Sequence, residues 1–253
     1  MHKDYEEKYY KVVKGAVPKD VCSFLYTYTR IKSLCARTLI NTNYPKYEPE
    51  HHGKFGERQV AGAYALYGDP VMETLLAMTC EIASKTIGLN LEPTYTYWRM
   101  YEKGHDLKRH KDRGSCQHSA TLCLGYDKSN LKDQSYNWPM YVGPVDGERN
   151  TDGVPIYLEP GDMLFYNGCQ LEHWRDPLLA KNQSQVFLHY VDKDGPLYDT
   201  CKFDARPHLG LPGAYRDSEK YMETIEIVGK HYNNKLSEEE KAQIRKELGL
   251  DPK

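Results

Sequence analysis

The sequence predicts a mainly β fold, a barrel or a sandwich, with helices flanking it at both ends of the chain. Seven short strand-like runs follow Pro93, with turn residues between them. Helical periodicity dominates before Pro93, and a capping box opens a charged helix near the C-terminus. With 253 residues and no Pro/Gly/Ser-rich linker, we expect one domain over 1-253. Its parts are a mainly helical support (1-92), a β core (93-192) and a C-terminal extension with a helix (193-253).

Two helices are expected in the N-terminal third. Pro18 opens the first, in which apolar side chains follow the 3.6-residue period: Val21, Phe24, Leu25, Tyr28 and Ile31. The second has Asp69 as N-cap, Pro70 in its first turn and Gly88 as its stop. Its apolar face comprises Met72, Leu75, Leu76, Thr79, Ile82 and Ala83.

The strands begin with residues 94–101, where side chains alternate between two faces. Tyr95, Tyr97, Arg99 and Tyr101 share one of them. Further strands are expected at Ser119–Leu124, Trp138–Val142, Pro155–Leu158, Met163–Tyr166, Gln170–Trp174 and Gln183–Val191. Turn residues at Pro160-Gly161-Asp162 and Asn167-Gly168 separate the later runs.

The C-terminal helix opens at Ser237, with Glu240 completing the capping box. We expect it to serve packing, or a contact between two copies of the chain in a homodimer, rather than chemistry.

Composition excludes several classes of protein. A formal net charge of -2 argues against broad nucleic-acid binding and favours a peptide or small molecule as partner. No run is long enough for a membrane span, and the first residues carry no signal-peptide pattern. Seven cysteines without Cys-x-x-Cys spacing fit reduced thiols. We therefore expect a cytoplasmic protein.

Three side chains have the chemistry of a metal site. His110 and Asp112 are two residues apart in an extended segment, so both can face one ion. His173 lies near the end of a later strand and would be the third ligand. Two histidines and one carboxylate form the facial triad of non-heme iron(II).

The surrounding residues carry a family resemblance. Tyr101, Gly104 and the His110-x-Asp112 pair resemble the Tyr-x-x-Gly…His-x-Asp signature of the 2-oxoglutarate/Fe(II)-dependent oxygenases, in particular the prolyl-hydroxylase-like branch. Thr121, the run Glu159–Phe165, Glu172-His173 and Pro177 match later landmarks of that family. The resemblance covers roughly residues 94–192. It implies a double-stranded β-helix (jelly-roll) core.

The resemblance also implies a reaction. Iron(II) held by His110, Asp112 and His173, with 2-oxoglutarate as cosubstrate and O2 as oxidant, would hydroxylate a substrate and release succinate and CO2. Related halogenases have a small residue at the position of Asp112. Its presence therefore favours hydroxylation, or demethylation driven by hydroxylation.

One position departs from the family. The anchor for the distal carboxylate of 2-oxoglutarate is usually Arg or Lys about ten residues after the second histidine, where this chain has Gln183. Three basic residues could replace it: Arg175 two residues past His173, Arg99 on the face of Tyr101, and Lys181 in a loop. Tyr101 matches the family tyrosine that reaches the cosubstrate.

Two other functions remain open. A cupin-like metal-binding protein on the same barrel would not use 2-oxoglutarate, although cupins usually carry His-x-His and Glu in their first motif. A non-enzymatic interaction module is the third candidate. Five basic side chains near the first two ligands would draw in the dianionic cosubstrate or an acidic substrate, or would form a solvated loop: Lys103, Lys108, Arg109, Lys111 and Arg113. We expect the N-terminal helices and the loops 127–137 and 143–153 to select the substrate.

Overall fold

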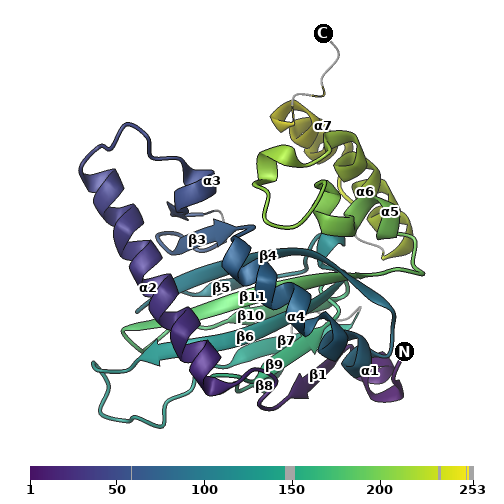
Figure 1. Cartoon of the computed structure of the whole chain (residues 1–253). Coiled ribbons are helices and arrows are strands. Elements are labelled where there is room, and N and C mark those ends of the chain that lie inside the picture. The colour runs from purple at the N-terminus through teal and green to yellow at the C-terminus, as the bar shows by residue number, and fades with distance from the viewer. Residues whose placement is uncertain (58, 146–151, 233–234, 249, 251–253) are drawn as a thin grey trace.

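Two antiparallel sheets form the centre of the computed structural model, which describes residues 1–57, 59–145, 152–232, 235–248 and 250 (Figure 1). The larger sheet has seven strands in the order β1-β9-β6-β11-β4-β3-β2, and the smaller has four in the order β5-β10-β7-β8. The strands are β1 (Tyr10–Val13), β2 (Lys54–Phe55), β3 (Tyr64–Tyr67), β4 (Leu91–Glu102), β5 (Leu107–His110), β6 (His118–Asp127), β7 (Met140–Val145), β8 (Val154–Ile156), β9 (Met163–Tyr166), β10 (Leu171–Arg175) and β11 (Asn182–Asp192).

The strands expected in the β core are present, and β4, β6 and β11 extend beyond both of their expected ends. β4 and β11 pair along most of their length, so that Gln183 lies opposite Tyr101 and Gln185 opposite Arg99. Residues 1-92, expected to be mainly helical, also contribute β1, β2 and β3 to the larger sheet. These three strands have two to four residues each, too few for an alternating pattern to show in the sequence.

Helices α2 (Lys19–Asn41) and α4 (Pro70–Ile87) run across the outer face of the larger sheet (Figure 1). The ends of α4 agree with the prediction. The Asp69 side chain accepts a hydrogen bond from the Val71 N–H (2.9 Å), and Gly88 ends the helix with φ 78°. Its apolar face packs with Trp98 and Met100 of β4 in the main core.

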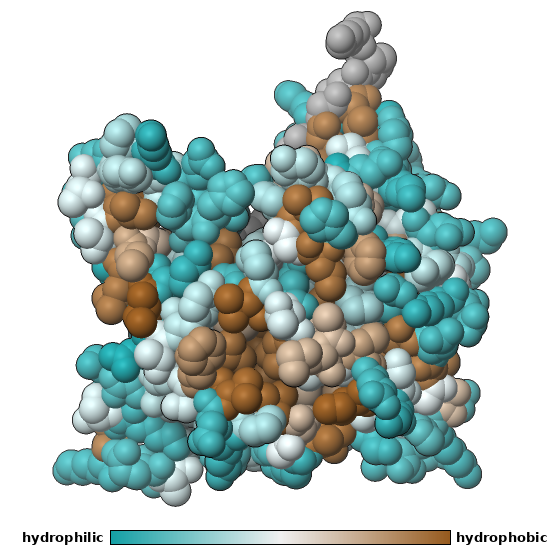
Figure 2. All heavy atoms as spheres, viewed as in Figure 1, coloured by the Kyte–Doolittle hydropathy of each residue, from teal (hydrophilic) through white to brown (hydrophobic). Residues whose placement is uncertain are grey.

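The apolar face expected for α2 is only partly buried. Leu25 is buried, but Phe24 is 67% exposed and Ile31 57% exposed. The helix instead buries Cys22, Thr29 and Ala36 with Leu25, so the face of α2 that packs against the protein is narrower than its apolar pattern suggested. Figure 2 shows the resulting hydrophobic side chains at the surface over α2 and α4.

The remaining helices flank the β core or follow it at the C-terminal end, and those labelled η are 3-10 helices. They are α1 (Lys3–Lys8), α3 (Pro49–His52), η1 (Gly114–Cys116), α5 (Tyr198–Cys201), η2 (Lys202–Ala205), η3 (Gly213–Tyr215), α6 (Ser218–His231) and α7 (Glu238–Glu247). The predicted capping box of α7 is present, with Ser237 and Glu240 exchanging both hydrogen bonds. Figure 2 shows a notch between the α2–α3 side of the molecule and the C-terminal helices. Within the described residues, no helix combines the length and apolarity needed to cross a membrane.

Candidate metal centre and cleft

The three predicted ligands come together at the end of the smaller sheet. Asp112 Oδ1 lies 3.5 Å from Nε2 of His110 and 3.5 Å from Nε2 of His173. One ligand atom from each residue lies within 4.8 Å of the other two. At metal–ligand bonds of about 2.1 Å, ligand atoms in a facial arrangement lie about 3 Å apart, so a small adjustment would seat one ion.

Strand pairing brings the two histidines together. His173 of β10 is the register partner of His110 of β5, and their ring centroids are 4.3 Å apart. Each ring places Nδ1 within hydrogen-bond distance of the carbonyl two residues before it, that of Lys108 (2.7 Å) or Leu171 (3.0 Å). A proton on Nδ1 that is donated to a carbonyl leaves the Nε2 lone pair facing the site.

The two histidines and Asp112 affect one another's protonation. Burial opposes ionisation of Asp112, but His173 and His110 outweigh it and hold the pKa of the carboxyl well below its usual range. For His110, burial opposes protonation, yet the hydrogen bond to Asp112 outweighs it and raises the pKa. The site thus keeps a carboxylate ionised in a buried setting, which suits a cation.

Gly168 gives the Asp112 carboxylate its room. The Asp112 N–H donates to the Gly168 carbonyl at 2.8 Å, so the two backbones run close together. A Cβ on Gly168 would lie 2.6 Å from Asp112 Oδ2 and would also collide with the Cys116 carbonyl. The Asn167-Gly168 turn seen in the sequence therefore has a steric role at the site.

A second row of buried side chains supports the triad from the larger sheet. Ser119 Oγ lies 3.3 Å from Asp112 Oδ2 and 2.8 Å from Nδ1 of His189. Burial lowers the pKa of His189 to about 4, so the ring is neutral. His189 thus faces the interior beside the triad.

A cleft of about 740 Å³ opens onto the triad. It is lined by Tyr95, Tyr97, Arg99, Phe187 and His189 from the larger sheet, and by residues of α3 and η3 at its mouth. Five basic and three acidic side chains line it, the basic ones being Lys54, Arg99, Lys111, Arg113 and Arg216. The cleft therefore favours a ligand that carries negative charge.

Arg99 lies in this cleft but is already paired. Its guanidinium makes an ion pair with Glu57 and donates to Gln59 (2.5 Å) and to the Tyr101 hydroxyl (3.2 Å). Glu57 also accepts from Tyr97 at 3.0 Å. Arg99 therefore has a local counter-ion.

Arg175 has none. Its side chain is 3% exposed, its Nη1 donates to the Trp138 carbonyl (2.9 Å), and it lies over the Trp138 ring at 4.6 Å. Among the residues that the structure describes, no carboxylate pairs with it, and its Nε is buried without a hydrogen-bond partner. A buried guanidinium without an anion is costly, which points to an anion bound here.

Of the other residues expected to contact the cosubstrate, two are buried and one lies at the surface. Gln183 is fully buried; its Nε2 donates to Gln185 (2.5 Å), while its Oε1 has no partner in the described part of the chain. Tyr101 is fully buried and packs edge-on against Trp138. Lys181 pairs with Asp127 and its side chain is 62% exposed, so it belongs to the surface.

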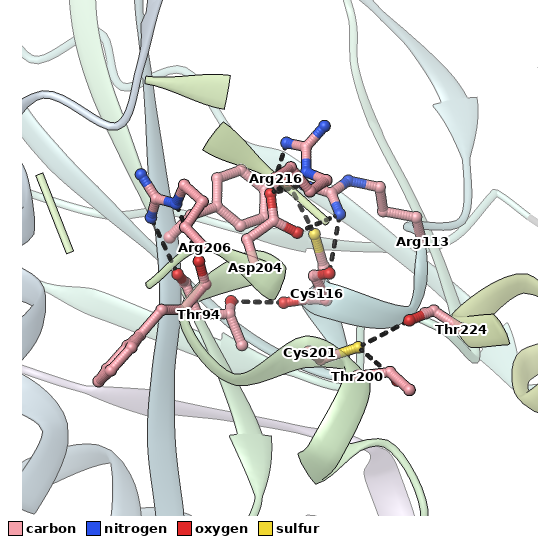
Figure 3. Close-up of polar contacts among 12 residues, drawn as sticks. Thr94, Arg113, Cys116, Thr200, Cys201, Asp204, Arg206, Arg216 and Thr224 are labelled. Carbon is pink, nitrogen blue, oxygen red and sulfur yellow. Dashed lines mark hydrogen bonds and ion pairs between the residues drawn. The ribbon is translucent and has the colours of Figure 1, made fainter. Parts of the chain in front are cut away.

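Figure 3 shows a polar network that the sequence did not reveal. Asp204 lies between Arg113 and Arg216: Arg113 donates to both of its carboxylate oxygens (2.5 and 2.8 Å), and Arg216 donates from Nε (3.0 Å) and Nη2 (2.5 Å). The sequence placed Arg113 beside Asp112 and in a basic cluster, without indicating a partner for it. Nothing in the sequence links the C-terminal extension to the site, because its residues carry no motif.

No protein-family model matches the chain, and no curated protein matches it in sequence. Solved structures do match. The prolyl-4-hydroxylase of Pseudomonas putida is 16% identical with a TM-score of 0.50, covering 75% of this chain and 95% of that chain. HygX from Streptomyces hygroscopicus, with nickel, 2-oxoglutarate and hygromycin B bound, is 10% identical with a TM-score of 0.52, covering 77% and 88%. The alpha ketoglutarate dependent epimerase SnoN from nogalamycin biosynthesis is 13% identical with a TM-score of 0.53, covering 82% and 91%.

At these identities the likeness concerns the fold. It confirms the predicted double-stranded β-helix, in which the smaller sheet carries both histidines predicted as ligands. The chain therefore has the jelly-roll fold of the prolyl-4-hydroxylase, HygX and SnoN structures.

Proposed function

We propose that this protein is an Fe(II)- and 2-oxoglutarate-dependent oxygenase that hydroxylates a peptide or a small molecule. The observation that carries the proposal is the triad: two histidine Nε2 atoms, both 3.5 Å from one carboxylate oxygen, at the inner end of a cleft. This donor set fits non-heme iron(II) and leaves three coordination positions for other ligands. The jelly-roll fold supports the same proposal.

When bound there, iron(II) and 2-oxoglutarate would supply the oxidising chemistry: O2 is consumed, 2-oxoglutarate yields succinate and CO2, and a substrate C–H becomes C–OH. His110, Asp112 and His173 would hold the metal. The two backbone carbonyls on the histidine Nδ1 atoms fix the ring orientation, and Ser119 steadies Asp112. Phe187 and Leu107 line the same cleft and reduce the water near the metal.

Arg175 is the residue we assign to the distal carboxylate of 2-oxoglutarate. It is two residues past His173 on the same inward face of β10, with the two Cα atoms about 6.6 Å apart. Two side chains that leave one face of a strand this close together can serve one dicarboxylate, His173 through the metal at one end and Arg175 at the other. The Gln183 amide and the Tyr101 hydroxyl would complete this polar end, whereas Arg99 has its counter-ion in Glu57.

Anaerobic spectroscopy tests the proposal. Iron(II) followed by 2-oxoglutarate should produce the weak visible charge-transfer band of the chelate, and O2 should then release succinate. His110→Ala should abolish the band, whereas Arg37→Gln, which removes a surface ion pair with Glu102, should keep it. Absence of the band in the unaltered protein, or an undiminished band in His110→Ala, would contradict the proposal. Iron binding without any effect of 2-oxoglutarate would instead favour the cupin-like alternative.

A further inference from the structure

Two arginines, Arg113 and Arg216, form one wall of the cleft, and Arg216 comes from the C-terminal extension. Arg216 follows η3 and Arg113 directly follows the ligand Asp112, and both line the cleft. Their side chains are 21% and 29% exposed, whereas Asp204 between them is 1% exposed (Figure 3). Two guanidinium groups thus reach the cleft while the carboxylate that holds them stays behind.

The charges of this wall do not balance. Asp204 is shared by Arg113 and Arg216, and Arg113, Arg216 and Tyr67 all donate to it. The nearby Arg206 is balanced by its own partner, Glu73, in a pair that is almost fully buried. One positive charge therefore remains on the wall. Among the described residues, no carboxylate or carbonyl oxygen accepts from Nη1 of Arg216.

The wall adjoins the metal ligands. The Arg113 guanidinium lies 4.4 Å from the centroid of the Tyr95 ring, and Tyr95 packs against His189 with a centroid distance of 4.5 Å. His189 reaches Asp112 through Ser119. One aromatic layer thus separates the arginine wall from the triad. If the two arginines held one group of a substrate, the carbon atoms next to that group would lie near the proposed metal site.

The backbone of the wall is unusual. Phe203, Asp204 and Ala205 all have positive φ, at 50°, 58° and 59°. Non-glycine residues rarely adopt this conformation, and successive ones are strained. The ion pairs from Arg113 and Arg216 hold Asp204 in this position. Strain of this kind gathers at ligand-binding segments, because the contacts formed there offset its cost.

We infer that Arg113 and Arg216 bind the anionic group, a carboxylate or a phosphate, of a small organic substrate. This inference rests on the proposed function for the target of the chemistry, but the anion site itself needs neither metal nor 2-oxoglutarate. It gives Arg216 of the C-terminal extension, together with Arg113, a part in the choice of a negatively charged substrate. Guanidinium groups suit both anions because they donate two parallel hydrogen bonds.

Calorimetric titration with four probes of similar size tests the inference: benzoate, phenyl phosphate, benzyl alcohol and benzylamine. Each is added to the protein alone and to the protein loaded with Ni(II) and saturating 2-oxoglutarate, so that the cosubstrate site is filled in the second arm. We expect benzoate or phenyl phosphate to bind in both arms, and the alcohol and the amine not to. The stronger of the two anions identifies the substrate's group.

Two variants separate a binding site from a structural clasp. Arg216→Gln should weaken anion binding by about ten- to a hundredfold, the effect of losing a charged hydrogen bond, whereas Arg37→Gln should not change it. Asp204→Asn should bind the anion more tightly, because the internal competitor for both guanidiniums is neutralised. If the Asp204 network only stabilises the fold, Asp204→Asn should lower the melting temperature and should not tighten anion binding.

Three results would overturn the inference: no anion binding in either arm, equal binding of the neutral or cationic probes, or unchanged binding in Arg216→Gln. If the iron(II)–2-oxoglutarate band is absent but the anions bind through Arg216, the proposed reaction fails while the anion site stands. If the band forms and Arg216→Gln binds anions normally, the reaction stands and the inference fails.

Discussion

His173 lies directly opposite His110 across the β10–β5 pair, with their ring centroids 4.3 Å apart. The proposed metal site thus depends on strand register, and a shift of either strand by one residue would turn one ring away from the site. Asp112 depends on a different contact, its backbone hydrogen bond to Gly168. Strand pairing and the turn together position the three proposed ligands.

Substitution of any ligand should remove the metal. We expect Asp112→Ala and His173→Ala to lower iron(II) affinity by more than the ten- to hundredfold, roughly, that is typical of losing a residue that only supports a ligand. Metal content after dialysis, measured by atomic absorption, checks this. His105→Ala is the control because its ring bonds the Glu102 N–H away from the triad. Full metal retention in Asp112→Ala would exclude the assigned site.

Arg175→Gln should raise the KM for 2-oxoglutarate by about ten- to a hundredfold, because one charged hydrogen-bonded contact is lost. Arg99→Gln should have a smaller effect on this KM, since Arg99 is paired with Glu57. Initial-rate measurement of succinate release gives both values. Adding Gln183→Lys to Arg175→Gln should recover part of the affinity by restoring a cation, on β11 of the larger sheet. An unchanged KM in Arg175→Gln would place the anchor elsewhere.

Gly168→Ala should weaken the metal site without removing a ligand. The added methyl group meets Asp112 Oδ2 and the backbone of Cys116, so the loop must move. Overpacking of this kind costs about 1–3 kcal/mol. We expect a lower melting temperature together with weaker iron(II) binding. Gly195→Ala, whose Cβ would lie 3.3 Å from the nearest atom, is the matched control. Equal iron(II) affinity in Gly168→Ala and the unaltered protein would contradict the steric role.

Stability should fall on acidification because of His118. Burial lowers its pKa from about 6.5 to about 4, and within the described structure the only hydrogen bond of its ring is with the Tyr5 hydroxyl (3.1 Å). The unfolded chain then binds the proton more readily, so this contribution is complete above about pH 6.5 and is lost progressively as the pH falls toward 4. The loss amounts to about 3 kcal/mol at most.

Urea unfolding at pH 7.5 and pH 5 measures this effect. His118→Gln should reduce the difference in free energy of unfolding between the two pH values, because the titrating group is gone. His208→Gln, at an exposed position, should leave the difference as it is. An equal pH dependence in His118→Gln would assign the effect to other buried groups.

Much of this architecture could be predicted from the sequence, for identifiable reasons. β4 is long enough for its alternation to show, and α4 carries both an Asp69 cap and a Gly88 stop. The His110-x-Asp112 pair is local, and the side-chain period of two in an extended segment puts both residues on one side. The inward direction of the Arg175 side chain follows from the same period of two, counted from His173.

Other features depend on contacts between distant parts of the chain. β1 and β2 are too short for a pattern, and Phe24 lies on the outer side of a helix whose inner side is narrow. The partner of Arg99 is Glu57, in a segment without a motif. The Asp204 network joins a residue of the extension to one beside a metal ligand, and only the folded chain brings them together. Of the expected substrate-selecting loops, 146–151 lie outside the described residues.

The division of the cleft between two parts of the chain has an evolutionary consequence. The three proposed metal ligands belong to the barrel, whereas Asp204 and Arg216 come from the extension after β11. Under the proposed function, a mutation of Arg216 would change which molecule is accepted while the three ligand side chains keep their positions. Selection could then act on this half of the anion site separately from the reaction chemistry, whereas the Arg113 half is tied to the segment that carries Asp112.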